Sequence, residues 1–259
     1  MVIARDLCER YAKHWGMGYV FIQMPTMTRT KALCNKLDVM QEQLNKLPEG
    51  EMLAFIDVDN FIARPSVDIR TYLDEHEIFI GQDIGRELNP ELVKFLGEQY
   101  KEKFFDRPAP FNLYSFMRSR CEYGGITTWA CGNRLLSCLY NPLGLNTGLV
   151  IIRHTPLMRE LISDCVNYAS ADWRFSRGVY RNYEDQDILA YFLQDRKYED
   201  SLGILGEHVQ GHFPGQFPRY VEGVTFARHC YGWGAQRRNE VALEISNNVE
   251  WKALKEQQG

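Results

Sequence analysis

The sequence predicts an α/β fold in which helices flank a single, mixed and mostly parallel sheet. Segments with the apolar period of a helix alternate along the chain with short apolar segments of strand length, the pattern of a layered fold with a mainly parallel sheet. In addition, Asp57 and Asp59 directly follow one of these strands. The carboxyl ends of strands are where open α/β sheets bind ligands, so the pair indicates both a fold class and a site.

The N-terminal third contains the clearest helix. Leucines and a methionine recur at steps of three and four between residues 33 and 47, and Pro48, Glu49 and Gly50 end the helix. An amphipathic helix before it begins near the N-terminus, where a fold of this kind normally begins on a strand. We therefore expect the first strand to be short, or the true start of the chain to be missing. The elements predicted here are a helix at 4–15, strands at 18–23, 52–56 and 77–81, and a helix at 89–105.

The rest of the chain has a less regular pattern of apolar residues. Residues 106–144 have aromatic and basic residues but no firm period, and a segment of that length within a compact domain commonly binds a ligand or forms a lid. Beyond it the pattern resumes. The elements predicted here are a strand at 149–152, a helix from 155 to about 169, a helix from 184 to about 194, strands near 203–205 and 224–227, and a helix at 239–258.

Composition bounds the function classes. The 259 residues carry a net charge of −4. A protein that binds nucleic acid normally has an excess of basic residues, so this charge gives no reason to expect a nucleic-acid partner. No apolar run approaches the length of a membrane span, and no signal peptide is apparent. The seven cysteines include no C-x-x-C pair, which argues against a zinc site and a complete disulfide framework. We expect a cytoplasmic protein; the alternative is a soluble lumenal fragment of a Golgi type II membrane protein.

The acid pair is the first candidate site. Two carboxylates at a strand end can hold a hard divalent cation and leave positions open for phosphate oxygens. The pattern alone is weak, because Asp185 and Asp187 repeat it. The alternative reading is that both acids are solvated strand-end residues or a helix cap.

Three further motifs could carry chemistry, and each has a plain structural alternative. Asn146, Thr147 and Gly148 precede a buried strand and could bind hydroxyls, or form a simple turn. The acidic helix start could supply a base or nucleophile, or only caps. A histidine near a strand end, followed by glycines, could bind a metal and phosphate, or be a buried structural histidine. The last two motifs are "EDQDIL" at 184–189 and "ARHCYGW" at 227–233.

In this order, the four motifs resemble those of the GT-A type nucleotide-sugar glycosyltransferases, and most closely the galactosyl-, mannosyl- and xylosyltransferase family that includes alpha-mannan and xyloglucan xylosyltransferase relatives. The resemblance covers about residues 4–233, from "NKLDVMQEQLNKLPEGEMLAFIDVDNFI" through "LNTGLVIIRHTP" and "EDQDIL" to "YVEGVTFARHCYGW". The family's first nucleotide-binding strand is missing or short here, and the acidic helix start has an extra acid.

The resemblance implies one GT-A domain over 1–259, with a nucleotide- and metal-binding half at about 1–80, a sugar and acceptor half at about 81–235, and a C-terminal helix at 236–259. It implies a glycosyltransferase, either a hexosyltransferase or a pentosyltransferase, that uses Mn²⁺ or Mg²⁺. The donor would be a nucleotide-sugar, UDP-sugar before GDP-sugar, and the acceptor a glycan or glycoprotein.

The same resemblance implies roles for named residues. The metal ligands would be Asp57, Asp59 and His229, with Asp59 making the chief bond. Asp185, or secondarily Asp187, would be the catalytic carboxylate. The resemblance favours a retaining reaction, and an inverting reaction is the alternative. The nucleotide and phosphate groups would contact Lys36, Asp57, Arg228 and Gly232, and the sugar would contact Asn146, Thr147, Gly148, Glu184 and Gln186. The alternatives are a sugar nucleotidyltransferase and a non-catalytic sugar-binding protein.

Overall fold

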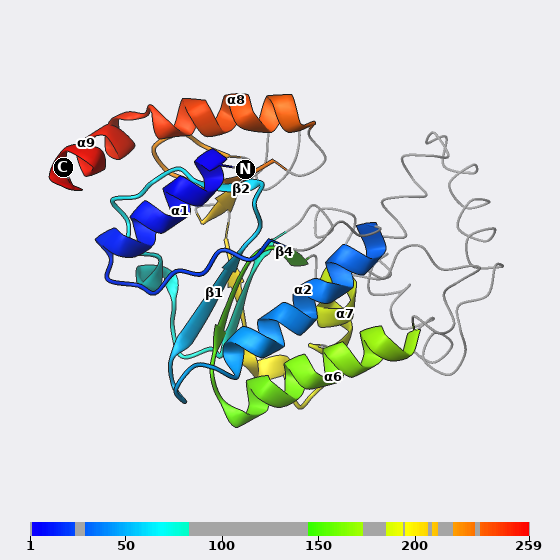
Figure 1. Cartoon of the computed structure of the whole chain (residues 1–259). Coiled ribbons are helices and arrows are strands. Elements are labelled where there is room, and N and C mark those ends of the chain that lie inside the picture. The colour runs from blue at the N-terminus through cyan, green and yellow to red at the C-terminus, as the bar shows by residue number, and fades with distance from the viewer. Residues whose placement is uncertain are drawn as a thin grey trace, which may run out of the picture.

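The computed structural model describes residues 2–23, 29–82, 145–172, 185–193, 195–206, 209–211, 220–230 and 234–258. Figure 1 shows helices on both sides of a central sheet. The helices are α1 (Val2–His14), α2 (Arg29–Leu44), α6 (Pro156–Asp172), α7 (Asp185–Phe192), α8 (Ala235–Ser246) and α9 (Val249–Gln258), with short 3₁₀ turns η1 (Ile69–Tyr72) and η3 (Glu199–Ser201). The strands are β1 (Met52–Ile56), β2 (Asn60–Ile62), β3 (Ile78–Gln82), β4 (Leu145–Arg153), β5 (Leu202–Leu205), β6 (Gln210–Gly211) and β7 (Ala227–His229).

The described strands form two mixed sheets. The larger has the order β1-β4-β3-β5, and the smaller has the order β2-β7-β6. Strand β4 runs antiparallel to both of its neighbours, whereas β3 and β5 are parallel. In the small sheet, β2 and β7 are antiparallel, and β6 and β7 are parallel. The predicted α/β class, with a mixed sheet flanked by helices, is confirmed.

The prediction of a single, mostly parallel sheet is wrong for the described residues. The chain turns sharply between β1 and β2, where the backbone N–H of Asn60 donates to the carbonyl of Asp57 (2.9 Å), so the strand after the acid pair joins the second sheet. Alternation of helices and strands in a sequence predicts layers, but it does not fix strand direction. Here β4 enters the centre of the large sheet in reverse.

Each face of the large sheet packs on its own hydrophobic core. Alternate residues of β3 and β4, among them Ile78, Ile80, Val150 and Ile152, pack against α2, α6 and α7. Their neighbours Phe79, Leu149 and Ile151 face the other cluster, which contains residues of α1, the small sheet, α8 and α9. This period-two division is what a strand buried on both faces requires.

The strand predicted at 18–23 is not present. Residues 17–23 have no regular secondary structure, and Val20 and Ile22 are 66% and 37% exposed. Alternating apolar residues form a strand only where a neighbouring strand pairs with them, and β1 pairs only with β4 among the described strands.

The predicted C-terminal helix is two helices. α8 ends at Ser246 and α9 begins at Val249. Asn248 separates them, because its side-chain oxygen accepts from the N–H of Trp251 (2.9 Å) and its amide donates to the carbonyl of Ala63 (2.8 Å). An asparagine that caps the following helix in this way favours a break over continued helix.

Other boundaries shift by a few residues. The strand predicted at 149–152 begins at Leu145, and the one near 224–227 lies at Ala227–His229. The helix predicted at 89–105 and the segment 106–144 lie outside the described residues, and the division into halves stays a prediction. No helix in the described part of the chain is long and apolar enough to cross a membrane.

Candidate metal and nucleotide site

The acid pair lies at the turn that connects the two sheets. β1 ends at Ile56, and the N–H of Asp57 donates to the carbonyl of Gly148 (2.9 Å). The carbonyl of Asp59 accepts from the N–H of Cys230 (2.8 Å). One backbone bond thus ties the turn to β4 in the large sheet, and the other ties it to the residue after β7 in the small sheet.

A bulge in β4 brings Asn146, Thr147 and Gly148 to this turn. In the pairing of β3 with β4, Ile80 is opposite Val150, but Gly81 is opposite Asn146. The three residues between are released from the ladder with β3, and such bulges redirect side chains next to active sites. The predicted turn before a strand is therefore a bulge within a longer strand, and its backbone is free to bond elsewhere.

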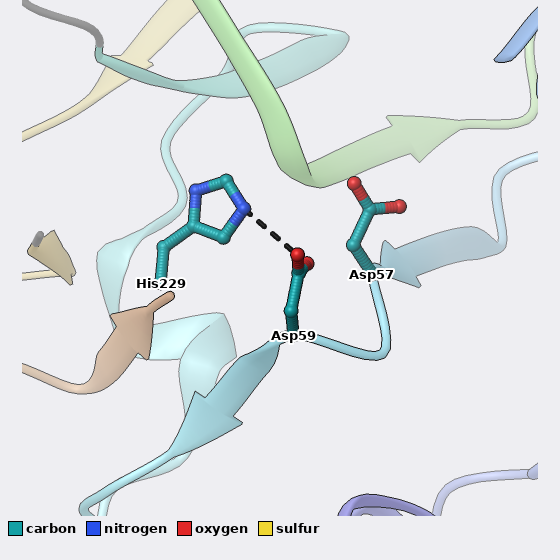
Figure 2. A group of neighbouring side chains, drawn as sticks. All are labelled: Asp57, Asp59 and His229. Atoms are coloured by element: carbon teal, nitrogen blue, oxygen red, sulfur yellow. Dashed lines mark ion pairs between the residues drawn. The ribbon is translucent and has the colours of Figure 1, made fainter. Parts of the chain in front are cut away.

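Asp57, Asp59 and His229 can together hold a metal ion. One ligand atom from each lies within 4.8 Å of the others. Figure 2 shows the ring of His229 beside Asp59, with its Nε2 atom 3.5 Å from the Asp59 Oδ1 atom. Carboxylate oxygens and one imidazole nitrogen suit Mn²⁺, since carboxylates favour hard cations and imidazole favours transition metals. The residues present thus fit the implied cofactor.

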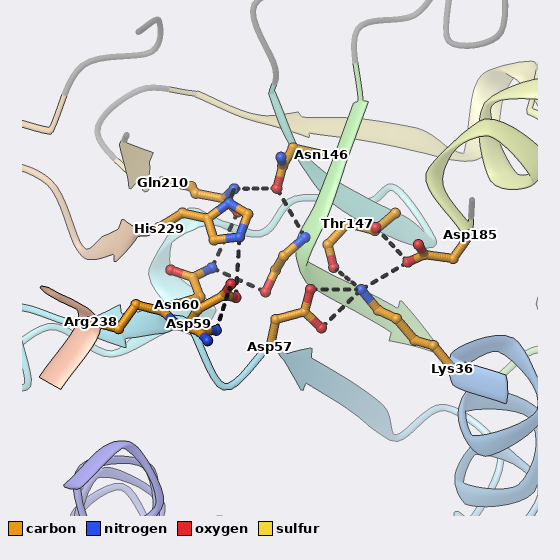
Figure 3. A network of polar contacts seen from close by, with 11 residues as sticks. Lys36, Asp57, Asp59, Asn60, Asn146, Thr147, Asp185, Gln210, His229 and Arg238 are labelled. Carbon is orange, nitrogen blue, oxygen red and sulfur yellow. Dashed lines mark hydrogen bonds and ion pairs between the residues drawn. The ribbon is translucent and has the colours of Figure 1, made fainter. Parts of the chain in front are cut away.

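Lys36 occupies a second charged cluster beside the triad. Its ammonium lies 3.0 Å from both carboxylate oxygens of Asp57 and 2.9 Å from Oδ2 of Asp185, and it donates to the carbonyl of Thr147 (2.6 Å). The Thr147 hydroxyl in turn donates to Asp185 (2.6 Å). Figure 3 shows this network, which joins α2, β4 and the first residue of α7.

The two aspartates of the pair have opposite electrostatic surroundings. For Asp57, burial and the charge of Asp185 raise the pKa more than Lys36 lowers it. Burial also opposes ionisation of Asp59, but contacts with His229 and the charge of Arg238 outweigh it and hold the pKa below its usual value. Burial would lower the pKa of Lys36, but the charges of Asp185 and Asp57 prevail and raise it. Lys36 therefore stays an ammonium, and Asp59 is the acid more readily ionised.

A layer of buried amides surrounds His229. The side chain of Gln210 on β6 lies 3.4 Å from the His229 Nδ1 atom and donates to Oδ1 of Asn146 (2.7 Å). Asn60 donates to the carbonyl of Gly148 (3.1 Å). All four of these polar side chains are at most 4% exposed, so the imidazole is held by fixed groups rather than by water.

Most of the predicted site residues that are described converge on this region. The exception is Arg228, whose guanidinium lies over the ring of Tyr220 (4.9 Å) and 3.5 Å from Glu244. It alternates with His229 on β7 and so faces the other side of that strand. Gln186 is half-buried in the first turn of α7. Glu184, Gly232 and the side chain of Asp187 lie outside the described residues.

Three residues at the site were not predicted. Asn60 follows the acid pair directly, and Gln210 lies between the strands predicted near 203–205 and 224–227. Arg238, on the first turn of α8, places its guanidinium 3.5 Å from Oδ2 of Asp59. The only sequence signal for it was its basic character, five residues after the histidine motif at 227–233. Arg238, not Arg228, is the arginine that faces the acid pair.

The fold formed by these sheets and the helices around them is GT-A-like. Among solved structures, the chain is similar to a glycosyltransferase involved in the glycosylation of the major capsid of PBCV-1, with a TM-score of 0.55 and 12% identity over 94% of this chain and 91% of that one. At this identity the similarity shows the fold alone. The resemblance inferred from the motifs is thus matched at the level of fold.

A second solved structure, mouse xyloside xylosyltransferase 1 in its apo form, covers 89% of this chain and 73% of that chain at 12% identity and a TM-score of 0.41. The lower TM-score does not establish a shared fold. No protein-family model matches the chain, and no curated protein matches it.

Proposed function

We propose that this chain is a metal-dependent glycosyltransferase that moves a sugar from a nucleotide diphosphate-sugar, with UDP preferred, to a hydroxyl of a glycan or glycoprotein acceptor. The observation that carries the proposal is the arrangement of Asp59, His229 and Asp57 at the end of β1, within a fold similar to that of a glycosyltransferase.

Asp59 is the proposed direct metal ligand. Both oxygens of Asp57 contact Lys36, whereas Asp59 faces the imidazole of His229. A bound divalent cation would neutralise the charge that develops on the leaving diphosphate. Asp57, restrained by Lys36, would contact the ribose or the hydration shell of that cation. Mn²⁺ is favoured over Mg²⁺ because the set includes an imidazole.

Lys36 is proposed to organise the site from beneath the diphosphate. The Lys36 side chain is 4% exposed, and its ammonium already contacts two carboxylates and a carbonyl. Arg238 on α8 is the more accessible cation, at 35% side-chain exposure, and is a better candidate for direct phosphate contact than Arg228. These assignments revise the phosphate-binding set predicted from the sequence.

Asp185 is proposed as a fixed negative charge near the reacting sugar carbon. One of its oxygens contacts both Lys36 and Thr147, and its side chain is 4% exposed. A carboxylate held in this way is better suited to stabilise a cationic sugar than to take a proton from an acceptor. This supports retention over inversion. Asn146, Thr147 and Gly148 stay candidates for contacts near the sugar, and the cytoplasm stays the proposed compartment.

Release of a nucleoside diphosphate tests the function, because water can replace the acceptor. The full chain would be incubated with a panel of UDP- and GDP-sugars, with Mn²⁺ or with a chelator, and the products separated by chromatography. We expect release only with Mn²⁺, lost in Asp59→Asn and kept in Asp6→Asn, whose carboxylate pairs with Arg10 on the surface of α1. Binding without release from any donor would favour a non-catalytic protein. Turnover of only a sugar 1-phosphate with a nucleoside triphosphate would favour a nucleotidyltransferase.

A further inference from the structure

The hydrogen bonds around His229 determine which of its two ring nitrogens carries the proton in the neutral ring. The chain of bonds starts at Gly148, whose backbone N–H can only donate. It donates to the side chain of Asn146 (3.0 Å), so the oxygen of that amide, and not its nitrogen, must face Gly148. The orientation of Asn146 is therefore fixed by the backbone.

The orientation of Gln210 follows from that of Asn146. The same Asn146 oxygen lies 2.7 Å from Gln210, so Gln210 must present its NH₂ group there. The carbonyl of Gly148 gives an independent second constraint. It accepts from the NH₂ of Asn60 (3.1 Å), which lies 3.5 Å from the side-chain oxygen of Gln210. Both backbone groups of one residue thus require the same orientation of Gln210.

The imidazole then has one consistent proton position. The NH₂ group of Gln210 lies 3.4 Å from Nδ1 of His229, and since that group can only donate, Nδ1 must accept. The proton of the neutral ring is on Nε2, which lies 3.5 Å from Oδ1 of Asp59. Figure 3 shows the path from Asn146 through Gln210 to His229 and Asp59.

Close packing holds this arrangement. Gln210 is 0% exposed, and a Cβ atom at Gly81 would lie 2.7 Å from its Cδ atom. A Cβ atom at Gly148 would lie 2.7 Å from Cε1 and 2.9 Å from Nε2 of His229. Two glycines therefore leave space for these two side chains, and the Gln210 amide cannot reverse without losing its bond to Asn146.

We infer that Gln210 is a positioning residue that keeps the His229 proton on Nε2, so that His229 donates to Asp59 and is a latent rather than a ready metal ligand. The inference rests on the proposed function, because it concerns the same site. A metal bound to Nε2 requires the proton on Nδ1, which would then face the NH₂ of Gln210. Gln210 therefore opposes ligation by His229 and lowers the affinity of the site for the metal.

The proton position can be measured without any metal. Two-bond ¹H–¹⁵N correlation spectra of the ¹⁵N-histidine-labelled chain, at about pH 8 where an ordinary histidine is neutral, distinguish the tautomers, and loss of one signal set in His229→Gln assigns the residue. We expect Nε2–H for wild type, and a mixture in Gln210→Met, which keeps the volume but has no amide. His154, buried just beyond the far end of β4, should be unchanged.

An Nδ1–H or doubly protonated His229 in wild type would overturn the inference, and so would an unchanged tautomer in Gln210→Met. Because this measurement uses no metal or nucleotide, it can succeed or fail independently of the proposed function.

The effect on metal binding separates this role from that of an ordinary supporting residue. Free Mn²⁺, measured by electron paramagnetic resonance during titration of the full chain, gives its dissociation constant. We expect Gln210→Met to bind Mn²⁺ about tenfold more tightly, the effect of about one net hydrogen bond. If Gln210 instead supported a metal-bound histidine, its replacement would lower the affinity for Mn²⁺ by about ten- to a hundredfold. That result would contradict the inference. If neither protein binds Mn²⁺, the proposed metal site fails, while the tautomer measurement still decides the role of Gln210.

Discussion

Among the single residues of the site, Lys36 provides the positive charge that offsets the cost of burying the carboxylates of Asp57 and Asp185. Its ammonium and the Asp185 carboxylate are each 4% exposed in their side chains. A buried charge that loses its partner costs far more than an exposed one, because water cannot replace the partner. The site is thus assembled around a buried ion pair whose loss would destabilise the folded protein.

Replacing Lys36 tests this directly. We expect Lys36→Met to lower the free energy of unfolding by about 3 to 5 kcal/mol, since it leaves Asp185 buried without its cation. Lys46→Met is the matched control, because Lys46 pairs with Glu42 at the surface with 59% side-chain exposure, and such pairs contribute about 0 to 1 kcal/mol. Urea denaturation measures both. Equal losses in the two variants would show that the Lys36 pair is not important for stability.

Gly148 is the residue whose missing side chain creates space for His229. We expect Gly148→Ala to destabilise the protein by about 1 to 3 kcal/mol, because the added methyl group would overlap the ring in a packed interior. Gly18→Ala is the control, since no described atom lies within 4 Å of a Cβ atom there. Thermal unfolding followed by circular dichroism compares them, and a Gly148→Ala protein as stable as the control would be incompatible with this role.

Some residues of the site could be predicted from the sequence, and others could not. Asp57 and Asp59 follow a recognisable strand, so their position at a strand end could be predicted from local pattern alone. Gln210 could not, because its role depends on contacts with Asn146 and Asn60, which are 64 and 150 residues away. The position of Arg228 over Tyr220, away from the acid pair, could not be predicted either, because the face that a residue of β7 presents depends on how that strand pairs with β2 and β6.

At the scale of elements, the bulge in β4 positions the site. The apolar run at 149–152 predicts a strand, but the release of Thr147 and Gly148 from β3 depends on how the two strands pair. Register is set by partners that are distant in sequence. Residues 18–23 have the apolar pattern of a strand but form none, because no described strand pairs with them.

Tyr198 links α6 to the turn that precedes β5. It is 2% exposed, and its hydroxyl donates to Asp164 on α6 (2.9 Å). Burial and then the Asp164 charge raise the pKa of Tyr198 from 10.0 to about 12. Because the folded-state pKa is raised, this contribution to stability is complete below about pH 10 and is lost as the pH rises towards 12.

The pH dependence gives a test at this scale. Between pH 10 and 12, we expect wild type to lose roughly 2 kcal/mol through this one group, and Tyr198→Phe to lose correspondingly less. Urea denaturation at a series of pH values measures the two slopes. Parallel slopes across that interval would mean that Tyr198 does not ionise differently in the folded and unfolded chains.

At the scale of the whole molecule, the site lies where two structural units meet. Lys36 and Asp185 come from helices that pack on one face of the large sheet, whereas His229 and Arg238 belong to the small sheet and α8 on the other side. Asp59 lies in the turn between the two sheets. The alternation of helices and strands predicted the layers. It could not predict the second sheet, which exists because the chain turns between Asp57 and Asn60. A ligand bound at this turn would contact both units.

The proposed function requires a divalent cation at Asp59 that binds a nucleoside diphosphate. Isothermal titration calorimetry of UDP into the full chain, with Mn²⁺ and then with a chelator, tests it most directly. We expect UDP to bind only in the presence of Mn²⁺, and this binding to be lost in Asp59→Asn but kept in Asp6→Asn. UDP binding that is equally strong with the chelator, or that is unchanged in Asp59→Asn, would contradict it.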